Sequence, residues 1–313
     1  MKFHWLNFHV PYACRDSGMC CTAGWPIPVE SARVPAIDVA IVQKVIPLRV
    51  GPWLSAAADA PDDIGGVLAL RDNGHCVFFE AGRSGCAIHE VKPAACVHFP
   101  YVCLIDPRGV RVTLSHYCPT AASLLFEHDG DIAIVEGPSP VPEGHVLEGL
   151  DARDALPPTA TDRPRLMSWE EFTAWEGVHV AQAMVGPMEP GDLTLFDQAR
   201  AAVPQPWDWP AARPDVEEAW SALVEPMWSR YEGALRRYAA AKIFGSWAAY
   251  QGDGLAAVTR VAAIAAAVVR VETARRCAEN GQPLDRYTLE RAIGQADLLL
   301  VHYADPERLA TVR

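Results

Sequence analysis

The stretch Cys14-Arg-Asp-Ser-Gly-Met-Cys20-Cys21 opens a series of eight cysteines that lie within the first 118 residues of the chain. The later members of the series are Cys76, Cys86, Cys96, Cys103 and Cys118, and Cys277 alone lies outside it. Thiolates are soft anionic ligands that suit zinc and iron–sulfur clusters. So many thiols in one segment indicate a metal site rather than ordinary packing.

The length and composition are those of a globular protein with a substantial core. The chain has 313 residues, of which 50% are hydrophobic and 21% charged, and its formal net charge is −12. This length allows two domains. No Lys/Arg-rich stretch stands out, so we expect no nucleic-acid partner and no binding to an anionic membrane surface. A protein partner or protein substrate is compatible with the sequence, which leaves the oligomeric state open.

The N-terminal residues 1–9 contain no apolar core of signal-peptide length. The most apolar later stretch, residues 261–269, is too short to span a bilayer. We therefore predict a cytoplasmic protein. Disulfides rarely persist in a reducing cytosol. The alternative, four disulfides in a secreted protein, lacks an export signal to support it.

Residues 1–150 are expected to be loop-rich, with short strands. Asp72-Asn-Gly74 predicts a hairpin turn between residues 66–71 and 76–79, and Ala81–Gly85 predicts a second turn. Asp106-Pro-Arg-Gly109 predicts a turn between strands at 101–105 and 110–114. Further elements are expected at three places: a strand at 131–135, a helix around 37–46, and a short helix after Pro119.

A proline-rich passage, from residue 137 to residue 164, predicts a connector. The pattern beyond it is helical. Helices are predicted over 168–184 and 193–203, from Asp215 to Gly252 with a break at Pro226, and over 255–280 and 289–303. The tryptophans of this half are expected to be mainly core residues. The predicted fold class is α+β, with a loop-rich cysteine-cluster domain over 1–150 followed by an all-α helical bundle over 165–313.

The cysteine spacing favours some metal centres over others. No C-x2-C knuckle occurs, so a conventional zinc ribbon fits poorly. Iron–sulfur clusters accept irregular spacing. A proline often follows the last ligand cysteine in ferredoxin-like runs, and Pro119 follows Cys118 here. The adjacent Cys20 and Cys21 are suited to serving different irons of a cluster. Eight thiolates match two four-cysteine sites, such as 4Fe–4S clusters. One or two iron–sulfur clusters are favoured, and zinc remains the alternative.

The cysteines also follow an ordered pattern of neighbours. Cys14-x5-Cys20-Cys21 is followed by Cys76-x-Phe78, Gly85-Cys86-x-Ile88-His89, Lys92-Pro93-x-x-Cys96 and Phe99-Pro100. This order resembles the YkgJ-type cysteine-cluster family, a zinc- or iron-chelating domain, over residues 12–120. The resemblance implies metal-binding roles for Cys14, Cys20, Cys21, Cys76, Cys86 and Cys96, and Cys103 and Cys118 extend the pattern. The chain lacks one of the usual cysteines in the first group and has Lys92 where Arg is typical.

The cysteine domain also resembles that of flagellin lysine N-methylases, which implies S-adenosylmethionine-dependent protein methylation as a further hypothesis. Residues 150–313 contain no Gly-rich strand-to-helix loop that would support it. His75, His89, His98 and His116 each lie near a cysteine and are candidates for direct ligation or for hydrogen bonds around the metal. Arg15, Asp16 and Ser17 are expected mainly to cap the local turn. No catalytic residue is predicted.

Overall fold

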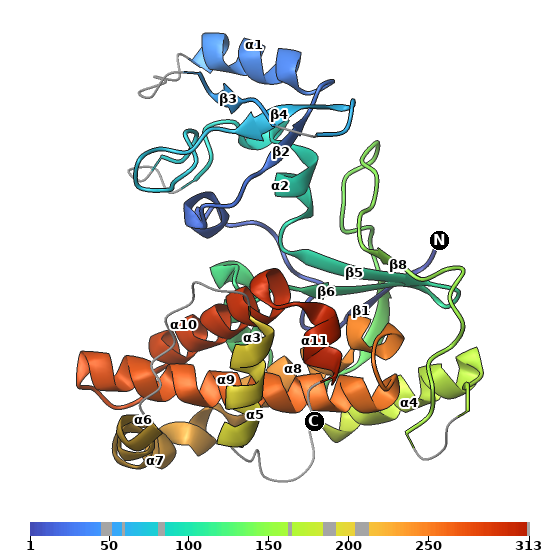
Figure 1. Cartoon of the computed structure of the whole chain (residues 1–313), viewed down its shortest axis with the longest axis vertical. Helices are drawn as coiled ribbons and strands as arrows, with labels where there is room; N and C mark the ends of the chain where they lie inside the picture. The colour runs from blue at the N-terminus through green and yellow to red at the C-terminus, as the bar shows by residue number, and fades with distance from the viewer. Residues whose placement is uncertain are drawn as a thin grey trace. The chain divides into compact units, whose positions relative to one another are not determined.

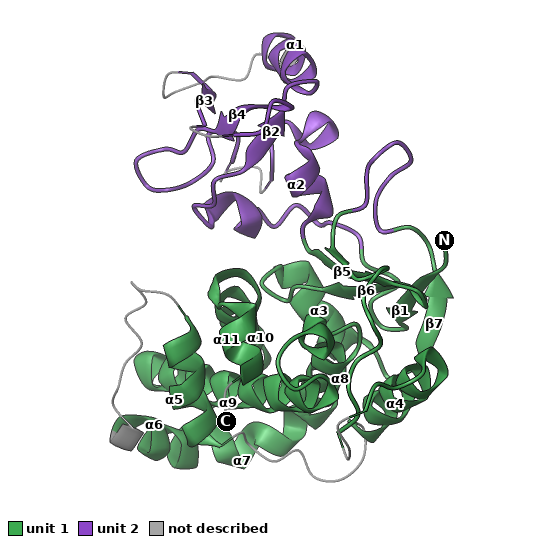
Figure 2. Cartoon of the chain, turned by 45° about the vertical axis from the view of Figure 1, so that its right-hand side comes forward, with its two compact units in different colours: residues 1–12, 100–139, 148–313 green, residues 13–99, 140–147 purple. Residues whose placement is uncertain are grey.

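The structure is a computed structural model that describes residues 1–44, 52–57, 60–80, 85–161, 165–183, 192–203 and 213–311. The chain forms two compact units (Figure 2). Unit 1 comprises Met1–Tyr12, Pro100–Ser139 and Glu148–Arg313, and unit 2 comprises Ala13–Phe99 and Pro140–Leu147. Residues 13–99 are therefore inserted into unit 1. The chain leaves unit 1 after Tyr12 and returns to it at Pro100.

Unit 2 is built from short elements around a small apolar core. Its sheet has the order β2-β4-β3, with β2 (Pro28–Glu30), β3 (Leu54–Ser55) and β4 (Ile64–Leu68), all antiparallel (Figure 1). Its helical elements are η1 (Met19–Thr22), α1 (Val34–Lys44), η2 (His89–Val91) and α2 (Ala94–His98). Val29, Ile37, Trp53, Phe78 and Ile88 are buried together in the core.

The predicted turn at Asp72–Gly74 is confirmed, since the Gly74 amide donates to the Arg71 carbonyl oxygen at 2.8 Å and Gly74 has φ +78°. The strand predicted over 76–79 is wrong. Cys76 and Phe79 instead form isolated bridges with Leu70 and Cys86. Most of the turn predicted at 81–85 lies outside the described residues.

Unit 1 contains a five-stranded sheet with the order β7-β1-β6-β5-β8. Its strands are β1 (Phe3–Leu6), β5 (Tyr101–Asp106), β6 (Gly109–Leu114), β7 (Ile134–Gly137) and β8 (Leu150–Asp151). The predicted β5–β6 hairpin is confirmed, with Tyr101 opposite Leu114. The strand predicted at 131–135 is found at 134–137. β1 pairs parallel with β6, although the inserted segment separates these two strands in the sequence.

Helices make up the rest of unit 1 (Figure 1): α3 (Pro119–Glu127), α4 (Trp169–Gln182), α5 (Leu193–Ala202), α6 (Arg213–Ala219), α7 (Glu225–Trp228), α8 (Glu232–Ile243), α9 (Leu255–Asn280), α10 (Arg286–Asp297) and α11 (Pro306–Thr311). Helix α9 packs against α5, α6, α8 and α10. It is buried on most of its faces, as its Ala/Val-rich sequence predicts.

Several helix ends follow directly from local chemistry. Ser168 begins α4 with a capping box, in which its side chain accepts from the Glu171 amide and the Glu171 carboxylate accepts from the Ser168 amide. Gly281 ends α9 in the left-handed conformation, at φ +61°. The helix expected to begin at Asp215 is described from Arg213 onward, so Asp215 lies inside α6. The helix expected to reach Gly252 ends at Ile243, since Gly245 at φ +60° turns the chain.

A charged residue buried in unit 1 is fully paired. Asp297 is 0% exposed and accepts hydrogen bonds from the His116 ring at 3.0 Å and from the Tyr238 hydroxyl at 2.8 Å. The Lys242 ammonium lies 2.5 Å from the same carboxylate. A buried carboxylate is tolerated when its lone pairs and its charge are matched in this way.

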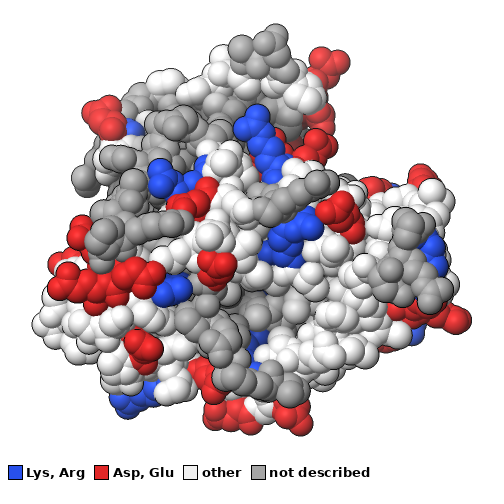
Figure 3. Space-filling view, turned by 60° about the horizontal axis from the view of Figure 1, so that its bottom comes forward, with Lys and Arg blue, Asp and Glu red and all other residues white. Residues whose placement is uncertain are grey.

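The α+β fold class is confirmed. The two units interleave along the chain, whereas the sequence predicts consecutive domains over 1–150 and 165–313; those domains, as independently folding segments, stay a prediction. None of the helices that the structure describes combines the length and hydropathy needed to cross a membrane. On the face shown in Figure 3, Lys and Arg lie singly or in small groups among Asp and Glu. The absence of a nucleic-acid partner stays a prediction.

Candidate metal centre

Five thiols of unit 2 interact with one another, and we call Cys20, Cys21, Cys76, Cys86 and Cys96 the five-thiol group. The Sγ atoms of Cys20 and Cys21 are 4.0 Å apart, and the Cys21 thiol is also hydrogen-bonded to that of Cys86. Cys76 and Cys96 interact electrostatically with Cys20 and Cys86. The structure thus gathers the thiols of η1, of Cys76 and Cys86, and of α2.

Local backbone features hold these segments close together. Gly18, at φ +72°, precedes η1, and a Cβ there would lie 2.2 Å from the Phe79 ring. Only glycine allows this approach. The Cys76 amide donates to the Cys21 carbonyl oxygen at 2.8 Å, which ties η1 to the 76–86 segment. Both features fix the adjacent pair beside Cys76.

Four members of the five-thiol group lie in or against the apolar core of unit 2. Cys76 is 6% exposed, and Cys21, Cys86 and Cys96 are partly buried against that core. Burial raises the pKa of Cys76 to about 11 and also raises the pKa of Cys96. Low polarity penalises free thiolates, so these cysteines are stable as anions only beside a compensating positive charge such as a metal ion.

Protons are distributed unevenly within the group. Hydrogen bonding from Cys21 lowers the pKa of Cys20 to about 7 and also lowers the pKa of Cys86. The same bonds hold the proton on Cys21 and raise its pKa. The Lys92 ammonium further favours the thiolates of Cys20 and Cys86. Negative charge therefore develops first on Cys20 and Cys86, which makes them the first thiols able to bind a metal.

The donor atoms of the group fit zinc or iron. All five are sulfur, which suits soft and borderline metals and suits magnesium or calcium poorly, since those ions prefer oxygen. The chain would hold the metal with thiols of η1, Cys76, Cys86 and α2, beside the apolar core of unit 2. All nine cysteines of the chain lie among the described residues, and none of them is joined in a disulfide bond there.

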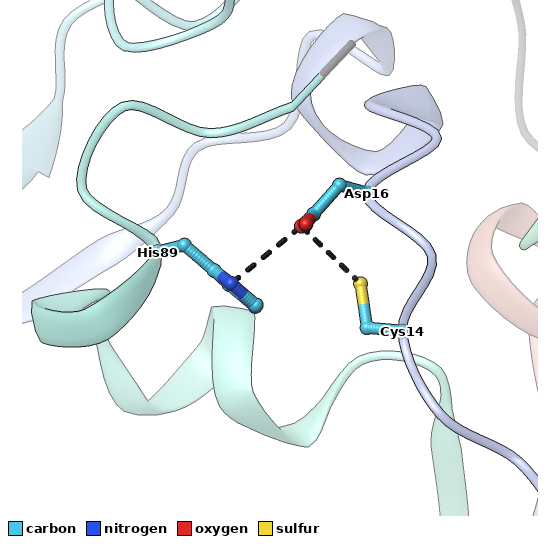
Figure 4. A group of neighbouring side chains, drawn as sticks. All are labelled: Cys14, Asp16 and His89. Atoms are coloured by element: carbon cyan, nitrogen blue, oxygen red, sulfur yellow. Dashed lines mark hydrogen bonds and ion pairs between the residues drawn. The ribbon is translucent and has the colours of Figure 1, made fainter.

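Cys14 lies in the loop before η1 beside two side chains of other types (Figure 4). Its Sγ is 3.8 Å from Asp16 Oδ1, and His89 Nδ1 is 3.6 Å from the same oxygen. One possible ligand atom from each residue lies within 4.8 Å of the other two. The sequence indicated Cys14 and His89 as candidates but treated Asp16 as a turn residue. The position of Asp16, two residues after Cys14, was the feature of the sequence that could have indicated a ligand role.

Two further predicted ligands, Cys103 and Cys118, belong to unit 1. Cys103 is 1% exposed on β5 opposite Val112, and burial raises its pKa to about 12. Cys118 precedes α3, with its Sγ 3.6 Å from the Tyr12 hydroxyl. Their assignment as metal ligands stays a prediction. Cys277, outside the series, is buried in α9.

The remaining histidines that the sequence singled out have other polar partners. His98 Nε2 donates to the Val146 carbonyl oxygen at 2.7 Å. His116 is bonded to Asp297 in unit 1. The side chain of His75 lies 3.3 Å from the Asn73 amide nitrogen, in the turn before Cys76. His89 is thus the one of the four predicted histidines that lies within metal-ligand distance of Cys14 and Asp16 among the described residues.

A family model, CxxCxxCC, with the description "Putative zinc- or iron-chelating domain", matches residues 13–119. Residues 13–119 of the chain are thus similar to this family. The resemblance to a cysteine-cluster family is therefore confirmed, and the domain is one described by chelation of zinc or iron. No curated protein and no solved structure matches the chain.

The spacing in the family's name also identifies the departure of this chain from the pattern. Placed on residues 14–21, C-x-x-C-x-x-C-C assigns its first, third and fourth cysteines to Cys14, Cys20 and Cys21. Its second cysteine falls on Ser17. The missing thiol of the first group is thus replaced by a hydroxyl, a weaker ligand for a soft metal.

Proposed function

We propose that unit 2 is an iron–sulfur protein domain whose cluster is held by thiolates of the five-thiol group. The observation that carries the proposal is that five thiols lie within hydrogen-bonding or electrostatic range of one another, one more than a closed structural zinc site takes. Two of the five, Cys20 and Cys21, are adjacent in the chain. Adjacent thiolates are better used by a centre with several metal atoms, where each binds a different iron.

The chain's own residues suit a redox role for such a centre. A bound iron–sulfur cluster supplies one-electron transfer. The apolar core beside Cys21, Cys86 and Cys96 lowers the local polarity, and Lys92 adds positive charge near the thiolates. Burial and neighbouring charge are the two means by which a protein sets the potential of a cluster.

The test is anaerobic purification of the full chain, followed by iron and acid-labile sulfide analysis and electron paramagnetic resonance. We expect iron and sulfide in comparable amounts in the wild type and their loss in Cys21→Ser and Cys86→Ser. Cys277→Ala is the matched control, because this thiol is buried in α9, outside the group. A folded protein without sulfide, or Cys21→Ser and Cys86→Ser variants that retain all their iron, would contradict the proposal.

A second candidate, a structural zinc site, is favoured by one distance. A tetrahedral ion with bonds of ~2.3 Å to sulfur separates its ligand sulfurs by ~3.8 Å. The Sγ atoms of Cys20 and Cys21 are 4.0 Å apart. This candidate predicts a colourless protein that contains zinc, contains no sulfide and unfolds in unit 2 when zinc is removed.

Methyl transfer from S-adenosylmethionine remains a prediction from the resemblance to flagellin lysine N-methylases. The residues that the structure describes add no observation in its favour. Calorimetric titration of the metal-loaded protein with S-adenosylmethionine tests it, and absence of a binding isotherm would remove it.

A further inference from the structure

Cys14, Asp16 and His89 form a group with three different ligand atoms (Figure 4). The three side chains come from two segments, the loop before η1 and the first residue of η2, and point toward one another. Cys14 is exposed, and the side chains of Asp16 and His89 are 44% and 41% exposed. We propose that this group is a second metal site for a divalent ion of the zinc type, in addition to the five-thiol group.

The distances between the three side chains are close to those that a metal ion needs. A tetrahedral ion with bonds of ~2.3 Å to sulfur and ~2.1 Å to oxygen or nitrogen places sulfur and oxygen about 3.6 Å apart, and oxygen and nitrogen about 3.4 Å apart. The observed separations are 3.8 Å for Cys14 Sγ to Asp16 Oδ1 and 3.6 Å for Asp16 Oδ1 to His89 Nδ1. Both pairs need only small side-chain adjustments to bind one ion.

The charge and the proton balance also suit a divalent ion. The Cys14 thiol donates its hydrogen to Asp16, so the metal replaces a proton that already bridges the two side chains. Binding releases this proton to solvent and leaves a thiolate and a carboxylate, whose two negative charges neutralise the dication. His89 contributes the lone pair of Nδ1 and keeps its proton on Nε2. The mixture of sulfur, oxygen and nitrogen matches borderline ions such as Zn²⁺.

The backbone brings the two segments together before any metal arrives. Gly85 lies against Asp16, and a Cβ at Gly85 would be 3.2 Å from the Asp16 Cβ. Asp16 itself has φ +52°, the left-handed conformation that Asp tolerates better than most residues. The His89 amide donates to the Cys86 carbonyl oxygen, which fixes the start of η2.

The family spacing explains why this chain has such a group. Ser17 occupies the second cysteine position of C-x-x-C-x-x-C-C, so Cys14 lacks the thiol that the pattern puts three residues after it. Asp16 and His89 supply two ligands beside Cys14. Three protein ligands leave the fourth position of a tetrahedral ion open to water, which makes this an accessible and exchangeable site.

The test uses the full chain, purified anaerobically, and titrates it with Co²⁺ and then Zn²⁺. We expect the wild type to bind one equivalent with a thiolate-to-cobalt absorption band. Binding should weaken by more than about tenfold in Asp16→Asn and His89→Gln, since even residues that only support a metal ligand contribute roughly 10–100-fold. The band should disappear in Cys14→Ser. Asp62→Asn, a change at an exposed acid of the same unit, is the matched control.

Iron and sulfide measured in the same samples separate this inference from the proposed function. Unchanged iron and sulfide in Asp16→Asn and His89→Gln, together with weaker Co²⁺ binding, support a second site. The inference is overturned if these variants bind Co²⁺ as the wild type does. It is also overturned if they lose the iron, because the three residues would then belong to the same centre as the five thiols. A wild type without iron whose cobalt band is lost in Cys14→Ser would sink the proposed function alone.

Discussion

The two units differ in the length of their helices and strands and in the polar groups that they bury. In unit 2 the longest helix, α1, has 11 residues and the longest strand, β4, has 5, whereas α9 of unit 1 has 26 residues. Unit 1 buries a charged residue, Asp297, with protein partners for each oxygen. Unit 2 gathers five thiols, and burial raises the pKa of two of them, Cys76 and Cys96. Small apolar cores commonly depend on a metal for stability, and we predict that unit 2 does so.

Removal of the metal is expected to have the largest effect. With the metal bound by an excess of chelator, or with Cys21→Ser, unit 2 should lose stabilisation on the order of 10 kcal/mol, the scale of structural metal binding. Hydrogen exchange should then show amides of β4 losing protection while those of α9 keep it. Returning the metal should restore β4. If β4 remained protected without metal, the apolar core of unit 2 would suffice and the contrast between the units would fail.

The second prediction concerns the buried carboxylate of unit 1. Asp297→Asn leaves Lys242 next to a neutral partner in a buried position, which should cost about 3–5 kcal/mol of the free energy of unfolding. Urea unfolding followed through the helices of unit 1 measures this loss, and the metal content should stay that of the wild type. Asp253→Asn is the control, since its pair with Arg260 is exposed and should contribute less than about 1 kcal/mol.

The third prediction is a dependence of unit 1 on pH. Burial lowers the pKa of His302 to about 4 from the ordinary value of 6.5, and its ring bonds to the Ser115 hydroxyl at 2.7 Å. Between these two values the unfolded chain binds more protons than the folded one. The free energy of unfolding should therefore fall as the pH drops from 6.5 to 4, by at most about 3 kcal/mol, because the ring is only partly enclosed.

Burial also lowers the pKa of His9 and His116, which adds to the pH effect in the same direction. Denaturant unfolding at pH 7, 5.5 and 4.5 tests the prediction, with His302→Gln removing the contribution of His302. A wild type whose stability is flat over this range would contradict it.

The smallest effect is expected at a helix end. Ser168→Ala removes the side chain that caps α4 and should cost about 1 kcal/mol. Ser221→Ala, at an exposed position in the π-helical turn Trp220–Val224, should be neutral or slightly stabilising. Thermal unfolding of both variants makes the comparison. Equal melting temperatures would mean that α4 is fixed by packing rather than by its cap.

The parts of the fold that sequence reasoning predicted are those set by local chemistry. Helix α9 has the predicted limits because its apolar run starts after Gly254 and ends at Gly281. The β5–β6 hairpin follows from its turn. The parallel pairing of β1 with β6 could not be predicted, since it joins residues 3–5 to 110–112 and no local pattern encodes such a contact. The same long-range pairing makes the strands around the insertion part of the helical unit.

The site shows the same division between local and long-range information. The five thiols of the group are among the eight cysteines that the sequence predicts as ligands, because ligand types and family spacing are visible in the sequence. Asp16 was assigned a turn role, since its proximity to His89 depends on how the loop before η1 folds against the segment that begins at Gly85. The association of Cys103 with a buried strand likewise required the β5–β6 register.

The insertion of unit 2 between Tyr12 and Pro100 has a consequence for biosynthesis. A ribosome delivers residues 13–99 well before the helices that complete unit 1, and domains begin to fold as they emerge. All five thiols are then available to bind a metal before β1 pairs with β6. The nascent chain would thus carry its metal before the larger half closes, and the late strip 140–147, which brings Val146 to His98, would arrive after loading.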